Sequence, residues 1–149
     1  MLKKLFRNRR GNSMVEFALA TPVALVLCVG AADFGRMFTE SAILAGAANA
    51  GAIYGYRTVG YAAETSNIQN AILTDAAELS GVAGSTEQLC DCPDSPKTWV
   101  SCNDTVCTGY GKPRAYVRSR ATKSFDTLGF YPGIPSEVSI DMSAYLRVQ

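Results

Sequence analysis

The longest apolar run of the chain lies close to its N-terminus. Residues 17–32 contain no charged side chain, and residues 14–38 are apolar apart from Glu16, Asp33 and Arg36. This run is slightly short for a free-standing span of about 20 residues, yet it is long for the hydrophobic region of a secretory signal. The pattern therefore predicts a helix that enters a membrane.

An Ala- and Gly-rich stretch continues the predicted helix over residues 38–64. Ala47, Gly51 and Gly55 recur every four residues and form a ridge of small side chains on one helical face. Such a ridge lets a second helix approach closely. Because each Gly weakens an isolated helix by about 1 kcal/mol relative to Ala, the ridge needs packing partners. These lie either in neighbouring subunits or within a single globule.

A second, shorter helix is predicted from about Asn67 to Leu79. Its apolar residues fall near one face, Ser66 or Asn67 can cap its N-terminus, and Gly81 can end it. After this helix, residues 81–113 have the composition of a loop, with three prolines, several glycines and four cysteines.

Strict alternation of apolar and polar residues predicts two strands near the C-terminus. Residues 137–148 alternate throughout. Within residues 114–125, apolar side chains alternate with arginines at Arg114, Ala115, Val117, Arg118, Arg120 and Ala121. This pattern is typical of antiparallel strands with one buried and one solvated face. A turn-rich segment, 129–136, joins them. The elements together predict an α+β fold in which a long N-terminal helix carries a small head.

The charge distribution supports a membrane protein. Residues 1–11 hold five of the 14 basic residues and no acidic one, so nine basic residues remain against all 13 acidic ones. A basic tail before an apolar run is typical of membrane targeting, and the positive-inside rule places that tail in the cytoplasm and the head outside. There is no histidine, and no motif for metal, phosphate or nucleophilic catalysis is present. We therefore expect no enzyme, no cofactor and no metal site.

Three arginines of the first predicted strand, Arg114, Arg118 and Arg120, share one face. One interpretation is a contact with an anionic surface or a nucleic acid. The other is a solvated strand face on which the arginines pair with Glu137 or Asp141. We favour the second and expect no nucleic-acid partner.

Four of the five cysteines cluster in the loop-like segment. In an exported head, an even number of clustered cysteines predicts two disulfides, and their spacing suits zinc poorly. Three pairings are possible and the sequence does not choose among them. A nested pairing, Cys90 with Cys107 and Cys92 with Cys102, suits a hairpin.

Glu16 lies just inside the apolar run, where a carboxylate costs free energy in lipid. Neither a secretory signal cut before Ala32 nor a plain single-pass anchor gives this carboxylate a role. In "RRGNSMVEF" a basic leader ends in Gly11, and Glu16 is the fifth residue after it. The segment resembles a prepilin peptidase site, with cleavage between Gly11 and Asn12.

The longer segment "GNSMVEFALATPVALVLCVGAADFGR" resembles the N-terminus of the TadE family, the pseudopilins of tight-adherence (Tad) pilus systems. The residues that carry the resemblance are Gly11, Glu16 with Phe17, Pro22, and the stretch 33–35. The resemblance implies a pilin or pseudopilin that a prepilin peptidase cleaves. It also implies that the Tad machinery assembles the protein, with other pilin subunits or copies of itself, into an adhesion pilus.

The spacing of Gly11 and Glu16 has a physical explanation in the pairing of two charges. Cleavage after Gly11 would create a cationic amine on Asn12, which can pair with Glu16 of a neighbouring subunit. Pairing recovers much of the several kcal/mol that an unpaired buried charge costs, and it fixes the register between subunits. The alternative is a carboxylate that snorkels at the membrane edge.

We therefore expect three regions: a leader (1–11), a helix with breaks (12–63) and an extracytoplasmic head (64–149). The protein would reside in the bacterial inner membrane and then in the periplasm or a pilus. The alternative function is a membrane-anchored binding module, whose disulfide-stapled loop recognises a ligand without forming a filament.

Overall fold

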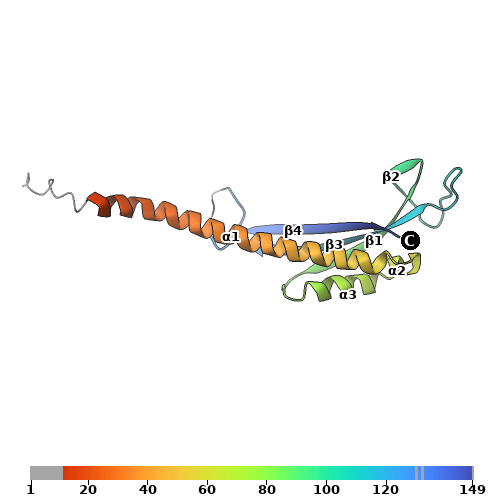
Figure 1. Cartoon of the computed structure of the whole chain (residues 1–149), viewed down its shortest axis with the longest axis horizontal. Coiled ribbons are helices and arrows are strands. Elements are labelled where there is room, and N and C mark those ends of the chain that lie inside the picture. The colour runs from red at the N-terminus through yellow and green to blue at the C-terminus, as the bar shows by residue number, and fades with distance from the viewer. Residues whose placement is uncertain (1–11, 130, 132, 149) are drawn as a thin grey trace, which may run out of the picture.

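A computed structural model describes residues 12–129, 131 and 133–148 of the chain. One helix of 44 residues, α1 (Asn12–Gly55), extends far beyond the rest of the molecule (Figure 1). Two short helices and four strands form the head: α2 (Val59–Ala63), α3 (Thr65–Asp75), β1 (Ala83–Cys92), β2 (Ser95–Val100), β3 (Arg114–Asp126) and β4 (Glu137–Arg147). The predicted α+β fold with a long N-terminal helix is confirmed.

The four strands form one antiparallel sheet in the order β2-β1-β3-β4. β3 lies inside the sheet, where Val117 is opposite Gln88 of β1 on one side and Leu146 of β4 on the other. The two strands predicted from alternation, β3 and β4, are therefore confirmed, as is their antiparallel pairing.

Residues 81–113 are not the loop that the sequence predicted, because they contain β1 and β2. The inward-facing positions of β1 include Gly84, Thr86 and Gln88, which are small or polar, so no hydrophobic alternation marks the strand. α3 explains the glycine, since a Cβ added to Gly84 would lie 3.3 Å from three side-chain carbons of Ile72.

The second helix exists, but its limits and its cap differ from the prediction. Ser66 and Asn67 lie inside α3, and Glu64 occupies the N-cap position without a side-chain capping bond. Instead, the Asn67 side-chain amide donates a hydrogen bond of 2.8 Å to the Glu64 carboxylate. The helix ends at Asp75, several residues before Gly81, because residues 76–80 already form turns.

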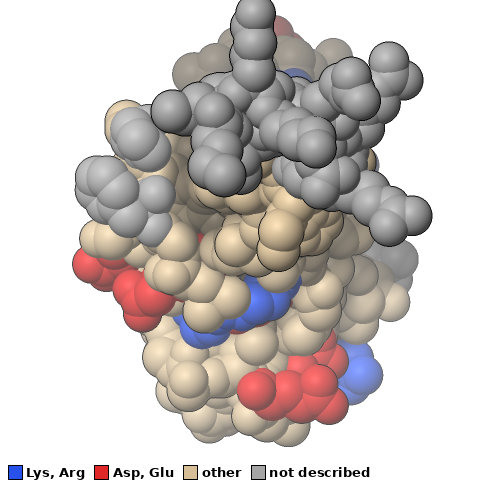
Figure 2. Space-filling model, turned by 90° about the vertical axis from the view of Figure 1, so that its left-hand side faces the viewer, with Lys and Arg blue, Asp and Glu red and all other residues tan. Residues whose placement is uncertain are grey.

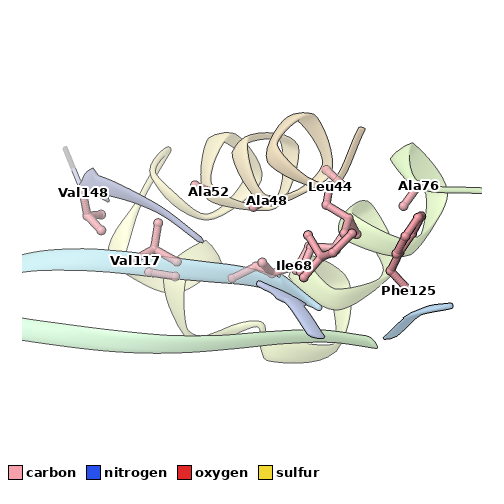
Figure 3. Close-up of a cluster of buried hydrophobic side chains, with 13 residues drawn as sticks. Leu44, Ala48, Ala52, Ile68, Ala76, Val117, Phe125 and Val148 are labelled. Carbon is pink, nitrogen blue, oxygen red and sulfur yellow. The ribbon is translucent and has the colours of Figure 1, made fainter. Parts of the chain in front are cut away.

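The hydrophobic core lies between the sheet and the two helices that cover one of its faces, α1 and α3 (Figure 3). Every second residue of β3 points into it, and the C-terminal half of α1 contributes small side chains that bring the helix close to the sheet. Its largest fully buried apolar side chains are Leu44, Ile68, Ile72 and Val117.

Candidate assembly helix and its attachment to the head

The N-terminal half of α1 is an exposed apolar surface. The helix is long and apolar enough to cross a membrane, and its most apolar stretch is not buried by the rest of the chain. Phe17, for example, exposes 73% of its surface. Such a surface is stable only against lipid or against other apolar helices.

The motif residues fall at the start of this helix. Glu16 and Phe17 lie on its exposed surface in the first two turns, and Asn12 is its first residue. Gly11, the residue before the expected cleavage point, lies outside the described residues. Figure 2 looks at the molecule from the end on which α1 extends. The described surface in view is largely uncharged, and the charged side chains form separate patches.

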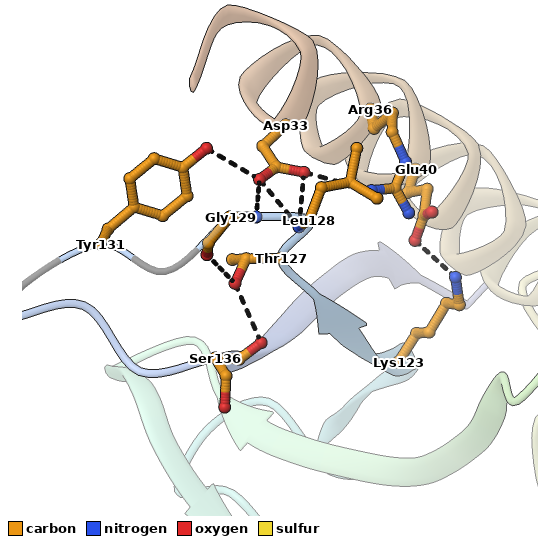
Figure 4. A network of polar contacts seen from close by, with 9 residues as sticks. All are labelled: Asp33, Arg36, Glu40, Lys123, Thr127, Leu128, Gly129, Tyr131 and Ser136. Carbon is orange, nitrogen blue, oxygen red and sulfur yellow. Dashed lines mark hydrogen bonds and ion pairs between the residues drawn. The ribbon is translucent and has the colours of Figure 1, made fainter. Parts of the chain in front are cut away.

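Asp33 attaches α1 to the head at the point where the exposed apolar stretch ends. Asp33 is 5% exposed, although it lies on a helix that is mostly exposed at this level. The backbone N–H groups of Leu128 and Gly129 donate to it at distances of 2.9 to 3.3 Å, and the Tyr131 hydroxyl donates at 3.0 Å (Figure 4). Arg36, one turn further along α1, adds an ion pair of 3.1 Å. Four donor groups therefore compensate one buried carboxylate.

Two further side chains continue this attachment toward the core. Glu40 of α1 forms an ion pair with Lys123 of β3, and both side chains are largely buried. The Arg36 guanidinium lies 5.1 Å from the centre of the Phe125 ring, within the range of a cation–π interaction. The polar contacts of Asp33, Arg36 and Glu40 thus lie on the face of α1 that meets the sheet.

The small-residue ridge of α1 packs within the chain. Ala47, Gly51 and Gly55 are all buried. A Cβ added to Gly51 would lie 2.5 Å from Ser119 Oγ, and one added to Gly55 would lie 2.8 Å from a methyl carbon of Val117. Of the two arrangements considered for the ridge, the structure has the one within a single globule. The part of α1 that the head leaves uncovered is its N-terminal half.

The four clustered cysteines form two disulfides, Cys90–Cys102 and Cys92–Cys107. The nested pairing is wrong, and the two bridges cross instead. The register of the hairpin gives the reason, because Val100 lies opposite Cys90 and Cys102 follows two residues later, with its Cα 5.2 Å from that of Cys90. Cys28, by contrast, is a free and exposed cysteine on α1.

Asp91, between two of these cysteines, is a buried carboxylate. It is 2% exposed and accepts two hydrogen bonds from Arg114, at 2.9 and 3.0 Å, and one from the Lys97 backbone at 2.9 Å. Burial by itself raises the pKa of Asp91, but these donors and the positive charge of Arg114 outweigh it and hold the pKa below its ordinary value. The alternation of β3 pointed to Arg114, but nothing in the pattern of β1 pointed to its partner.

The other two arginines of β3 are also paired. Arg120 donates to Asp141 at 2.8 Å, as the solvated-face interpretation expected. Arg118 pairs with Glu87 of β1, which was not anticipated. Glu137, the other expected partner, accepts a hydrogen bond from the Ser124 hydroxyl. Among the described residues, no group of acidic, cysteine or histidine side chains could hold a metal ion.

Comparison with known proteins connects this geometry to a family. A family model described as TadE-like protein matches residues 11–52. The match begins one residue before α1, includes the exposed apolar half and Asp33, and ends at buried Ala52. No curated protein and no solved structure matches the chain.

Proposed function

We propose that this chain, a pilin-like protein whose TadE-like N-terminal domain associates it with Tad pili, is a structural subunit that a prepilin peptidase cleaves between Gly11 and Asn12. The mature subunit assembles through α1 into a Tad-type adhesion pilus, or primes or caps one. Its partners are the peptidase, the Tad machinery, and other pilin subunits or further copies of itself. TadE-like proteins are structural and pilus-associated, so no catalytic role is proposed.

One observation carries this proposal. The residues that match the TadE-like model include the exposed apolar half of α1, which the head does not cover. This surface has two successive uses. It spans the inner membrane before assembly, and it packs against the same surface of neighbouring subunits afterwards. The basic residues before it favour a cytoplasmic N-terminus and an external head.

Glu16 acts as the assembly specifier in this proposal. Cleavage leaves a cationic amine on Asn12, four residues before Glu16 and on the same apolar segment. In a bundle of such helices, pairing the amine of one subunit with Glu16 of the next compensates both charges. A subunit displaced along the bundle would move the two charges apart. Phe17 lies beside this pair and packs between neighbouring helices.

The mature N-terminus tests the cleavage. Mass spectrometry of the protein from its native membrane should find Asn12 as the first residue. A chain that retains Met1, or one that begins near Ala32, would overturn the proposal, because no new amine would then exist next to Glu16.

A matched pair of variants tests the assembly. Glu16→Ala should accumulate as stable protein in the membrane but be lost from filaments released by shear. Glu78→Ala removes an exposed carboxylate after α3 in the head and should assemble normally. Normal assembly of Glu16→Ala would count against the ion pair.

The far end of the head supports a second candidate function. The disulfide-bonded hairpin borders a hollow of about 650 Å³, lined by Asp91, Pro96, Lys97, Arg114 and three aromatic side chains, Trp99, Tyr116 and Tyr145. A membrane-anchored module could recognise a ligand there without any filament. Absence of the protein from purified filaments, together with an uncut N-terminus, would favour this alternative.

A further inference from the structure

We propose that the loop between β3 and β4 inserts its apolar side chains into the membrane leaflet on the side of the head. The described residues of this loop that carry the proposal are Leu128, Gly129, Tyr131 and Ile134, and we call them the foot residues. The inference rests on the membrane span of α1 and is independent of whether the protein enters a filament.

Besides their hydrogen bonds to Asp33, Gly129 and Tyr131 lie beside the apolar half of α1. A Cβ added to Gly129 would lie 3.2 Å from a methyl carbon of Val29, and one added to Gly30 would lie 3.9 Å from the Tyr131 ring. Both helix residues precede Asp33, the first charged residue after Glu16. At a rise of 1.5 Å per residue, Val29 lies about 6 Å closer to the membrane centre than Asp33 does.

The loop also exposes apolar surface at this level. Leu128 is 66% exposed and Ile134 is 55% exposed. A hollow of about 320 Å³ lies between the loop and α1, with Phe34, Met37 and Ile134 among its lining residues. This apolar surface is continuous with the exposed surface of the span. The lipid that surrounds the span therefore also surrounds the loop.

Four backbone N–H groups of the loop meet the requirement that lipid imposes on irregular structure. In an apolar environment each backbone N–H needs a partner within the protein. The N–H groups of Leu128 and Gly129 donate to Asp33, that of Thr127 donates to the Ser136 carbonyl at 3.0 Å, and that of Ile134 donates to the Tyr131 carbonyl at 3.1 Å. Asp33 therefore both holds the loop against the helix and satisfies two of its amides.

Tyr131 fits the boundary between lipid and water. Its ring packs along Gly30, while its hydroxyl turns back to Asp33 (Figure 4). Tyrosine is enriched at membrane interfaces because one end of its side chain is apolar and the other is polar. Together, span and loop give the head two points of contact with the membrane, which fix its tilt as well as its position.

Depth-dependent quenching of tryptophan fluorescence tests the inference in the full chain. Trp99 is the only tryptophan of the chain and lies in β2, at the far end of the head from the exposed half of α1 (Figure 1). We would combine Trp99→Phe with Ile134→Trp, and separately with Leu128→Trp, in phosphatidylcholine vesicles. Lipids brominated near the carbonyl end of their acyl chains serve as the quencher. Both replaced positions are well exposed, so the new side chains need no space in the core.

A tryptophan at position 134 or 128 should lose fluorescence at least about twofold in brominated vesicles, as expected for an aromatic group at the interface. The unmodified chain, with Trp99, should lose almost none. An integral chain whose new tryptophans are not quenched would overturn the inference, whether water or another protein surface covers them. A chain that alkaline carbonate washes from the vesicles would overturn the span as well.

Discussion

The Asp33 carboxylate on α1 and the Tyr131 hydroxyl lie 3.0 Å apart, although 98 residues separate them in the sequence. Their contact joins the end of the exposed apolar stretch to the loop after β3. Because the Leu128 and Gly129 amides meet the same carboxylate, the head is fixed against α1 at this level in rotation as well as in distance.

Removal of this carboxylate should release the loop. Asp33→Ala leaves two amides and one hydroxyl without their acceptor, and we expect the free energy of unfolding to fall by about 2–4 kcal/mol. Hydrogen exchange of the Leu128 and Gly129 amides in the detergent-solubilised chain measures the local effect. Tyr131→Phe removes one of the donors and should cost about 0.5–1.5 kcal/mol with little change in exchange. Unchanged exchange in Asp33→Ala would show that other contacts hold the loop.

The close approach of α1 to the sheet should make Gly51 intolerant of a methyl group. A Cβ there would lie 2.5 Å from Ser119 Oγ and 2.6 Å from Ile72 Cγ1, so Gly51→Ala should destabilise the chain by about 1–3 kcal/mol. Gly35→Ala is the control in the same helix. No atom lies within 4 Å of its added Cβ, and it should stabilise by about 0.5–1 kcal/mol. Denaturant unfolding in detergent compares the two variants, and equal effects would contradict the packing.

Ser119 offers a further check on that contact. Its hydroxyl is fully buried and has no hydrogen-bond partner among the described residues. Ser119→Ala should therefore be neutral or stabilising, since a buried hydroxyl without a partner costs about 1–3 kcal/mol. The same substitution should recover part of the stability that Gly51→Ala loses. Additive effects in the double variant would show that the two sites do not touch.

The buried pair of Asp91 and Arg114 should make stability depend on pH in the acid range. The pKa of Asp91 lies below its ordinary value of 3.8 in the folded chain, so the ionised carboxylate stabilises the fold. That contribution is complete above the unfolded pKa and is lost as the pH falls through the folded one. Denaturant midpoints measured downward from pH 5 should therefore decline. The decline should be smaller in Asp91→Asn, which is less stable than the parent at pH 7.

An exposed pair provides the comparison. Asp141 pairs with Arg120 on the solvated face, where both side chains are about two-fifths exposed, so Asp141→Asn should change stability by less than about 1 kcal/mol. If the denaturant midpoints of Asp91→Asn and Asp141→Asn declined equally as the pH falls, burial of Asp91 would be excluded as the cause of the acid sensitivity.

Peptide mapping under non-reducing conditions should recover the crossed disulfides, Cys90–Cys102 and Cys92–Cys107. Each closes a short segment, and removal of either pair by substitution with serine should cost about 2–4 kcal/mol. Both changes should loosen the β1–β2 hairpin and leave the packing of α1 intact. Recovery of peptides that join Cys90 to Cys107 would contradict the register of that hairpin.

The elements with strong periodicity were predictable from the sequence, and those with small or polar inward residues were not. β3 and β4 alternate clearly because their inward positions carry apolar residues such as Val117 and Ile140. β1 turns Gly84, Thr86 and Gln88 inward because α3 lies so close, and its pattern therefore resembled a loop. Without β1, neither the disulfide register nor the partner of Arg114 could be derived.

The candidate assembly helix and its attachment to the head were likewise predictable only in part. The apolar half of α1 and Glu16 are visible in the sequence, because a long uncharged run interrupted by one carboxylate is a local signal. Asp33 was noted only as part of a family motif, since its partners come from a loop far along the chain. A lone acidic residue at the end of an apolar run, followed by an arginine three positions later, is the signal that could have pointed to this attachment.

Because α1 is continuous, a pull on its membrane-spanning end passes to the head along one covalent helix. The pull enters the head where Asp33, Glu40 and the glycine ridge hold α1 against β3 and β4, and the strands share it by shear along the helix axis. The crossed disulfides lie beyond this path, at the far end of the sheet (Figure 1). The hairpin can thus vary in shape while the mechanical strength of the protein depends on the contacts of α1 with the sheet.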